Sequence, residues 1–218
     1  MVLQCSSNGV IHDLAEANPN MSDNERVVNL YWALTCILRS GVEGDIVELG
    51  CNAGFTSVLF GMLIEAEDPK RFLHLYDSFE GLPCPSAHDS YLKEGDCATT
   101  IEDVHRSFDR WNVRRPRIHP GWFSETLPSE LPEKVAFGYL DSDFYESILV
   151  SLEHVWPRLS SGGSLVVDDY SDVKVNPRAW DGLPGVRKAC EEFFADRSVK
   201  ATVLTGVGDL AFVELRKP

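Results

Sequence analysis

Residues 44–57 read GDIVELGCNAGFTS and join a short apolar strand to a helix through a glycine turn. The apolar run ends at Gly50, and a second glycine, Gly54, precedes a stretch whose apolar spacing predicts a helix over 54–67. Glycine at such a turn lets the backbone approach a ligand closely, and the helix N-terminus adds unpaired amide groups. We therefore predict that this turn binds a ligand, the alternative being a tight turn without one.

The spacing of the glycines excludes two common phosphate-binding turns. A dinucleotide site usually carries G-x-G-x-x-G, whereas Cys51 and Asn52 follow the first glycine here and the third glycine is absent. A Walker A loop needs Gly-Lys-Ser/Thr, and the sequence contains no such tripeptide. The turn therefore favours a ligand other than a nucleoside triphosphate or a dinucleotide.

The rest of the chain alternates strands and helices. We predict strands over 44–50, 71–79, 115–123, 135–141, 162–170, 200–206 and 210–217, and helices over 22–41, 54–67, 99–112, 144–159 and 185–196. Ser22 is the expected N-cap of the first helix, with Glu25 three residues later, and Gly41 ends it. This alternation predicts one α/β domain over 1–218, with a mainly parallel sheet, helices on both faces, a terminal hairpin, and 1–40 as a helical extension or lid.

Acidic side chains follow several of these strands. Residues 135–147 read VAFGYLDSDFYES, with Asp141 and Asp143 after the apolar run, and residues 164–170 read SLVVDDY, with Asp168 and Asp169. Because the carboxyl ends of parallel strands share one edge of a sheet, we expect these acids to converge there. Neighbouring carboxylates repel one another and are costly to bury without compensation. The alternative is that Asp168 caps a turn while Asp169 faces solvent.

Asp77 ends the second predicted strand and suggests a nucleoside-bearing ligand. An acid at this position can accept hydrogen bonds from the two hydroxyls of a ribose, although a loop aspartate also caps turns. The segment EGDCATT, residues 94–100, could form the adenine end of the pocket through Asp96 and Ala98, with an N-cap role as the alternative. Trp122 and Phe123 could line the site or belong to the core.

Composition narrows the function classes. A net charge of -14 argues against a surface that binds nucleic acid, because phosphate contacts need clustered Lys and Arg. The six cysteines are scattered without a C-x-x-C pair or zinc-ligand spacing, which favours reduced thiols in a cytoplasmic protein. The N-terminus has neither a basic leader nor a long apolar segment, so we expect neither export nor contact with a membrane.

The chain resembles the macrocin O-methyltransferase-like family of S-adenosylmethionine-dependent enzymes. The blocks that carry the resemblance are MSDNERVVNL, GDIVELGCNAGFTS, LYDSFEGLP, GWFSETLP, GYLDSDFYES, GGSLVVDDY and GVRKACEEF, in this order along the chain. The resemblance implies a Rossmann-like class I methyltransferase fold, S-adenosylmethionine as cofactor and a divalent metal, usually magnesium. The implied metal ligands are Asp141, Asp168 and Asp169, with Asp143 as a substitute for Asp141. The expected cofactor contacts are Glu48, Gly50, Asn52, Gly54, Asp77, Ser78, Asp96, Ala98 and Asp141, the last also being the expected catalytic residue.

The resemblance predicts methylation of a small-molecule hydroxyl, such as a sugar or phenol of a natural product. The alternatives are a noncatalytic S-adenosylmethionine-binding protein and a nucleotide-dependent oxidoreductase. None of the six histidines stands in a motif that marks a general base, although His88 could reach the pocket. Only twenty residues precede Met21, fewer than is usual in this family, so we expect a reduced lid. A homodimer or higher homo-oligomer is also expected.

Overall fold

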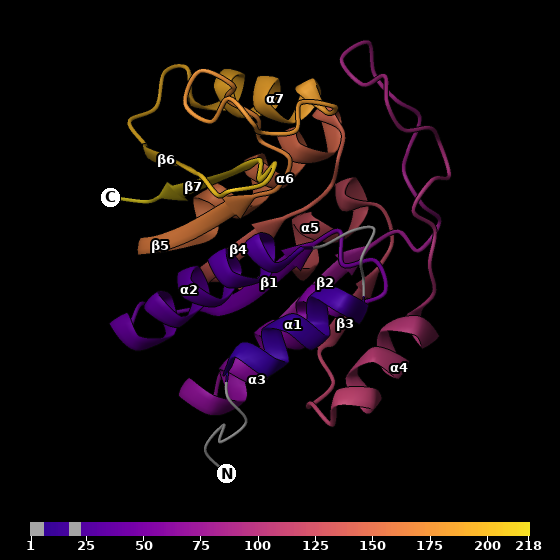
Figure 1. Cartoon of the computed structure of the whole chain (residues 1–218), viewed down its shortest axis with the longest axis vertical. Coiled ribbons are helices and arrows are strands. Elements are labelled where there is room, and N and C mark those ends of the chain that lie inside the picture. Colours follow the sequence, from indigo (N-terminus) through magenta and orange to yellow (C-terminus); the bar gives the residue numbers. More distant parts are fainter. Residues whose placement is uncertain (1–6, 18–22) are drawn as a thin grey trace.

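One seven-stranded sheet organises the protein, as a computed structural model of residues 7–17 and 23–218 shows (Figure 1). The strands are β1 (Asp45–Leu49), β2 (Leu73–Asp77), β3 (Arg117–Pro120), β4 (Val135–Leu140), β5 (Leu159–Val167), β6 (Lys200–Leu204) and β7 (Phe212–Arg216). Their order across the sheet is β3-β2-β1-β4-β5-β7-β6. The first five strands run parallel, and β7 pairs antiparallel with both β5 and β6. The predicted parallel sheet with a terminal hairpin is confirmed.

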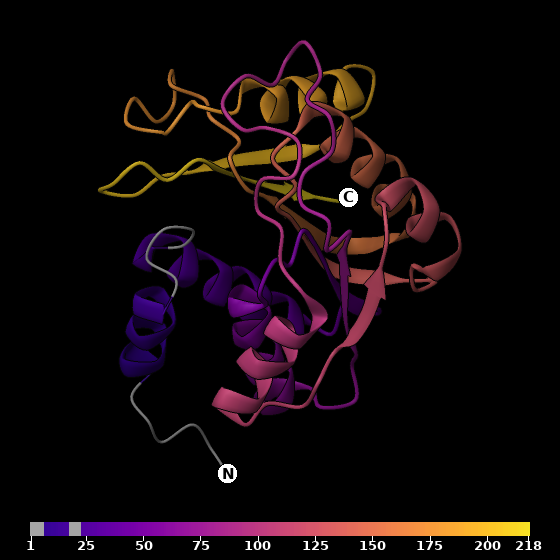
Figure 2. The same ribbon diagram turned by 90° about the vertical axis from the view of Figure 1, so that its right-hand side faces the viewer.

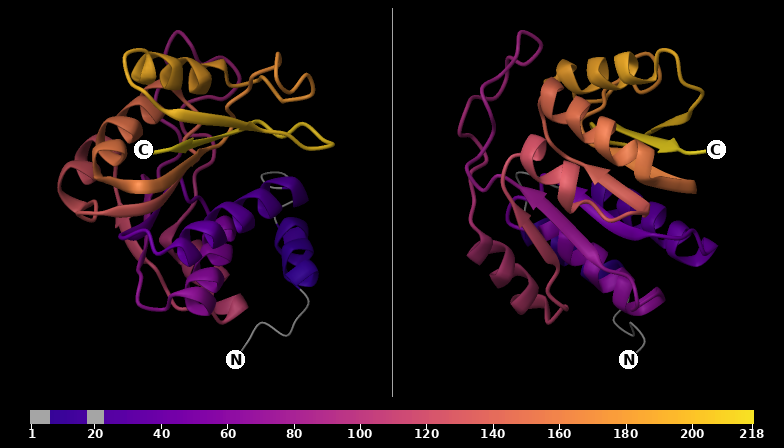
Figure 3. Two further views of the ribbon diagram at one scale, coloured as in Figure 1. Left: turned by 90° about the vertical axis from the view of Figure 1, so that its left-hand side faces the viewer. Right: turned by 180° about the vertical axis from the view of Figure 1, so that it is seen from behind.

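Helices cover both faces of the sheet (Figures 2 and 3). They are α1 (Ser7–Ala17), α2 (Asn24–Ser40), α3 (Phe55–Glu67), α4 (Ile101–Trp111), α5 (Phe123–Glu130), α6 (Tyr145–Arg158) and α7 (Pro184–Phe194). Alternate strand residues face opposite layers: Ile46 packs with α2 and α3, whereas Val47 packs with α6 and α7. Within the described ranges, none of these helices has the length and apolarity needed to span a membrane.

Helix α2 begins one residue later than the sequence pattern predicts. Its N-cap is Asp23, whose side chain accepts a hydrogen bond from the backbone N–H of Arg26 at 2.7 Å. The predicted cap, Ser22, lies outside the described residues, and the prediction was wrong because the aspartate next to it already supplies the acceptor. The helix ends as predicted at Gly41, which has a left-handed φ of 73°.

The segment after β3 was predicted incorrectly. The expected strand over 115–123 shortens to β3, because the chain turns at Gly121 with a φ of 134° and Trp122 becomes the N-cap of α5. Helix α5 was missed because it is short and contains Pro128, which weakens a helical pattern. This change places Trp122 and Phe123 at the carboxyl edge of the sheet.

Candidate active site

A cavity of about 890 Å³ lies at the carboxyl edge of the sheet. Residues that follow or end each of the five parallel strands contribute to its wall: Gly50 and Asn52, Asp77 and Ser78, Gly121 to Ser124, Asp141 to Asp143, and Asp168 and Asp169. Ligands of open α/β sheets bind at this edge, where the chain leaves neighbouring strands in opposite directions. The topology therefore brings the predicted acids together.

Gly50 is required by the packing of two strand ends. Its φ is 87°, and a Cβ atom placed there would lie 1.7 Å from the backbone oxygen of Asp141. The backbone of β1 thus approaches the end of β4 more closely than any side chain permits. The sequence pattern explains this glycine by close approach of a ligand. The structure gives a second explanation, because only glycine leaves room for the backbone of Asp141.

Asp77 ties the first two turns together. Its Oδ2 atom accepts a hydrogen bond from the backbone N–H of Asn52 at 2.9 Å, and its Oδ1 atom accepts one from Phe79 at 2.9 Å. The side chain of Asn52 donates in turn to the carbonyl of Cys97 at 2.8 Å. Burial raises the pKa of Asp77, and the backbone N–H groups oppose that rise. Asp77 therefore positions the turns, and its contact with a ribose stays a prediction.

Three carboxyl groups form a compact cluster at the rim. Asp141, Asp143 and Asp169 each offer an oxygen atom, and these atoms lie within 4.8 Å of one another. Burial, followed by repulsion from neighbouring aspartates, raises the pKa of Asp141 and Asp169 well above the ordinary value and that of Asp143 to about 7. Asp143 and Asp169 also hold left-handed φ angles of 58° and 56°, which side chains rarely adopt. The cluster is thus costly in both charge and backbone conformation.

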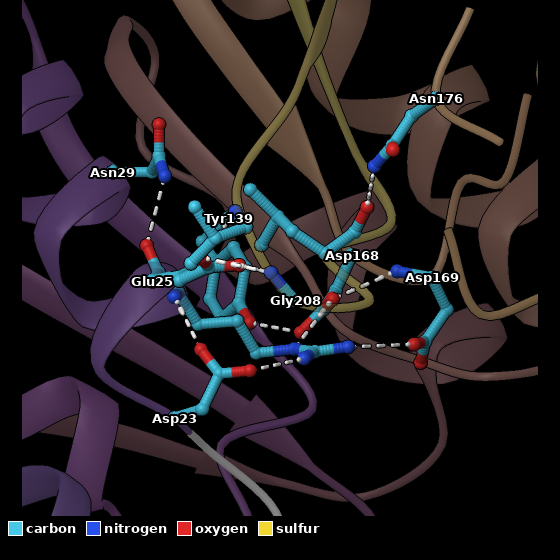
Figure 4. Close-up of polar contacts among 11 residues, drawn as sticks. Asp23, Glu25, Asn29, Tyr139, Asp168, Asp169, Asn176 and Gly208 are labelled. Carbon is cyan, nitrogen blue, oxygen red and sulfur yellow. Dashed lines mark hydrogen bonds and ion pairs between the residues drawn. The ribbon is translucent and has the colours of Figure 1, made fainter. Parts of the chain in front are cut away.

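Asp168 lies beside this cluster and faces other partners (Figure 4). Its Oδ2 atom accepts a hydrogen bond from the hydroxyl of Tyr139 at 2.5 Å, and its Oδ1 atom accepts from the Nε atom of Arg26 at 3.3 Å. Asp169 does not face solvent, since only 9% of its surface is exposed and Arg26 contacts its Oδ1 atom at 3.4 Å. Metal binding by Asp141, Asp168 and Asp169 therefore stays a prediction. The compact set of carboxylate oxygens contains Asp143, together with Asp141 and Asp169, in place of Asp168.

The predicted cofactor residues divide into two groups. Gly50, Asn52, Asp77, Ser78 and Asp141 line the cavity, whereas Glu48, Gly54, Asp96 and Ala98 are not among its lining residues. Cys97, between the last two, lines it instead. All six histidines belong to the part of the chain that the structure describes, and none lines the cavity. His88 packs against Tyr145.

Several lining residues were not singled out from the sequence. They are Asp23, Arg26, Tyr91, Trp180, Leu183 and Asp209, among others. Tyr91 and Trp180 come from separate loops and meet edge to face, with ring centroids 5.2 Å apart. Arg26 stands in a sequence block that marks the family resemblance, but its partner Asp168 is 142 residues away, so no local pattern indicates the contact.

Comparison with known proteins gives the family. The family model described as macrocin-O-methyltransferase (TylF) matches residues 7–205. The chain is 35% identical, over 67% of its length, to the 8-demethyl-8-(2,3-dimethoxy-alpha-L-rhamnosyl)-tetracenomycin-C 4'-O-methyltransferase of Streptomyces olivaceus, of which it spans 60%. It is 30% identical, over 78% of its length, to the mycinamicin III 3''-O-methyltransferase of Micromonospora griseorubida, of which it spans 67%. The solved structure of the O-methyltransferase NovP superposes with a TM-score of 0.77 at 26% identity, covering 89% of this chain and 80% of NovP. A seven-stranded sheet with acids at its carboxyl edge and a family match over residues 7–205 lead to one conclusion: the chain belongs to the macrocin-O-methyltransferase family.

Proposed function

We propose that the protein transfers a methyl group from S-adenosylmethionine to a hydroxyl of a small molecule, with a natural-product sugar as the favoured acceptor. The family and the names of its relatives support the reaction class. The sugar is supported by the Streptomyces relative, which is named for a rhamnosyl-bearing tetracenomycin. The observation that carries the proposal is the cluster of partly buried carboxylates in the wall of the cavity.

The charge at the rim favours cationic ligands. Many acids gather on or directly below it, among them Glu48, Asp77, Asp141, Asp143, Asp168 and Asp169. The guanidinium of Arg26 contacts two of them. Since buried like charges repel, a ligand that brings positive charge lowers the free energy of the site. S-adenosylmethionine carries a sulfonium, and a divalent cation carries two charges, so both suit this rim.

The side chains present fit a hard divalent cation. Asp141, Asp143 and Asp169 offer carboxylate oxygens within 4.8 Å of one another, and such oxygens are the ligands that magnesium prefers. Asp168 would hold the end of β5 in place through Tyr139 and Arg26, or supply a further oxygen. When bound, the cation would supply Lewis-acid chemistry, which lowers the pKa of an acceptor hydroxyl.

The wall of the cavity offers two kinds of side chain, which suggest separate contacts for cofactor and acceptor. The turn at Gly50 and Asn52, together with Asp77, would hold the nucleoside part of the cofactor. Tyr91 and Trp180 offer aromatic faces in another part of the wall, where they could pack against the acceptor. Asp141 lines the cavity at the end of the central strand β4, which is where the predicted catalytic role would require it.

The proposal is tested by methyl transfer to a panel of rhamnosylated and phenolic acceptors, followed by mass spectrometry. We expect a product 14 mass units heavier, about the mass of one added CH₂ group, and loss of turnover after chelation and in Asp141→Asn. The control is Asp196→Asn, because Asp196 is exposed and lies outside the cavity.

Different outcomes identify which part of the proposal fails. Full turnover after exhaustive chelation would show that the reaction needs no metal, and that part of the proposal would fail. Binding of S-adenosylhomocysteine without turnover on any acceptor would favour the noncatalytic alternative. Tight binding of NADH with no binding of S-adenosylhomocysteine would favour the oxidoreductase.

A further inference from the structure

Arg26 lies against the acidic rim, and Figure 4 shows its partners Asp23, Asp168 and Asp169. Each nitrogen of its guanidinium faces a different carboxylate: Nε lies 3.3 Å from Asp168, Nη2 3.4 Å from Asp169, and Nη1 3.1 Å from Asp23. Only 13% of the side chain is exposed. Burial alone would lower the pKa of Arg26, but Asp168 and Asp169 outweigh it and raise that pKa further above its usual value. Arg26 is therefore a permanent positive charge within the site.

The backbone at the start of α2, which carries Arg26, is held by contacts that do not involve the rim. Arg26 stands in the first turn of α2, whose N-cap Asp23 holds the Arg26 backbone N–H. The neighbouring Glu25 accepts hydrogen bonds from the backbone N–H groups of Val207 at 2.5 Å and Gly208 at 3.0 Å in the loop between β6 and β7. These contacts anchor the start of α2 against the hairpin, so replacing the Arg26 side chain leaves the attachment of the helix in place.

Asp169 belongs to two groups at once. It is a member of the compact set of oxygens with Asp141 and Asp143, and it is also a partner of Arg26. A divalent cation held by that set would therefore meet the charge of Arg26 across a shared carboxylate. Two positive charges so close together repel each other, and each is stabilised by attraction to the carboxylate of Asp169.

We propose that Arg26 is the internal counter-ion of the acidic rim, so that its guanidinium and a divalent cation share the carboxylate of Asp169. This inference rests on the metal site of the proposed function. Arg26 weakens the binding of the cation and stabilises the fold when the cation is removed. It is a positioning residue, since it acts on Asp168 and Asp169 rather than on a substrate.

The test compares Arg26→Met with wild type in the full-length, chelator-stripped protein. Mn²⁺ binding is followed by electron paramagnetic resonance of the free ion, and thermal unfolding is followed with and without saturating Mg²⁺. We expect Arg26→Met to bind Mn²⁺ at least about tenfold more tightly, because a unit charge beside a divalent ion matters strongly at the effective dielectric of a protein. We also expect its melting temperature to fall by roughly 2–4 °C in chelator and by much less in Mg²⁺.

Two controls separate charge from side-chain packing. Arg26→Lys keeps the charge and should behave like wild type within about threefold in Mn²⁺ affinity, given the cost of losing a forked guanidinium. Arg39→Met removes an arginine from the last turn of the same helix, where it pairs with Glu67 at the surface, and should leave Mn²⁺ binding unchanged. If Arg26→Met proves too unstable, Arg26→Gln replaces it, because glutamine retains a donor without the charge.

Three results would overturn the proposal, and they can be distinguished. Equal or weaker Mn²⁺ binding in Arg26→Met would mean that Arg26 orients the ligands or is not coupled to them. An equal loss of melting temperature with and without Mg²⁺ would show an ordinary structural ion pair. Absence of Mn²⁺ binding in wild type would instead remove the metal site of the proposed function, and the inference with it.

Discussion

Replacing Glu48 with glutamine should make the protein more stable at alkaline pH. Glu48 lies in β1 with 1% of its surface exposed, and its Oε2 atom has no hydrogen-bond partner among the described residues. Burial, together with repulsion from Asp77, raises the pKa of Glu48 from 4.5 to about 8. The ionised form is therefore the unfavourable one in the folded protein.

The sign and size of the effect follow from proton linkage. Because the pKa of Glu48 is higher in the folded than in the unfolded chain, its contribution to stability is fully present below pH 4.5 and is lost as the pH rises through about 8. One pKa unit corresponds to about 1.4 kcal/mol, so the free energy of unfolding loses as much as about 5 kcal/mol over this interval. Glutamine has nearly the same shape and does not ionise, so Glu48→Gln should lack this loss.

The assay is urea unfolding at pH 5, 7 and 9 in the presence of a chelator. We expect similar stabilities at pH 5 and a gain of roughly 2–4 kcal/mol for Glu48→Gln at pH 9. Glu133→Gln is the control, because Glu133 is exposed and its neutralisation should leave the pH dependence as it is in wild type. A Glu48→Gln protein whose stability followed that of wild type at every pH would refute the reasoning.

Two further substitutions test the turns. Asp77→Ala should weaken binding of S-adenosylhomocysteine by about 1.5 to 3 kcal/mol, measured by calorimetric titration, since charged hydrogen bonds are lost; unchanged affinity would remove Asp77 from the cofactor site. Gly50→Ala should lower the free energy of unfolding by more than about 3 kcal/mol, because the added methyl group would collide with the backbone of Asp141. Gly41→Ala, which adds a methyl group at a similar φ with no neighbour within 4 Å, should cost only about 1 kcal/mol, and equal losses would contradict the packing argument.

The sequence was sufficient to predict that acids would meet at one edge. Parallel strands and the alternation of strand and helix are local patterns, and the convergence of Asp141 with Asp168 and Asp169 follows from them. Which carboxylate faces which neighbour is decided by backbone angles that the pattern does not contain. The left-handed conformations of Asp143 and Asp169 turn both residues at the strand ends, and Asp143 thereby joins the most compact cluster.

Contacts between distant segments were beyond prediction from periodicity. The approach of Gly50 to Asp141 depends on β1 and β4 being neighbours, and the approach of Arg26 to Asp168 depends on where α2 crosses the sheet. Each involves residues separated by dozens of positions. A local spacing rule applies to one helix or strand at a time, so it identifies the residues without indicating their partners.

The strained backbone angles and clustered carboxylates of the cavity lower the stability of the fold, and the same carboxylates would attract a cationic ligand. Four non-glycine residues with left-handed φ angles line the cavity, namely Asn52, Cys97, Asp143 and Asp169, and the aspartates there repel one another. A ligand that binds only the folded state raises the free energy of unfolding with the logarithm of its concentration relative to its Kd, and a ligand that relieves an existing repulsion has the lower Kd. A cationic ligand should therefore stabilise this protein more than a neutral ligand of equal size at the same concentration, because it relieves the repulsion between these aspartates. Repulsion between carboxylates at the carboxyl edge thus lowers the stability of the fold, and the same interaction would favour the binding of a positively charged ligand.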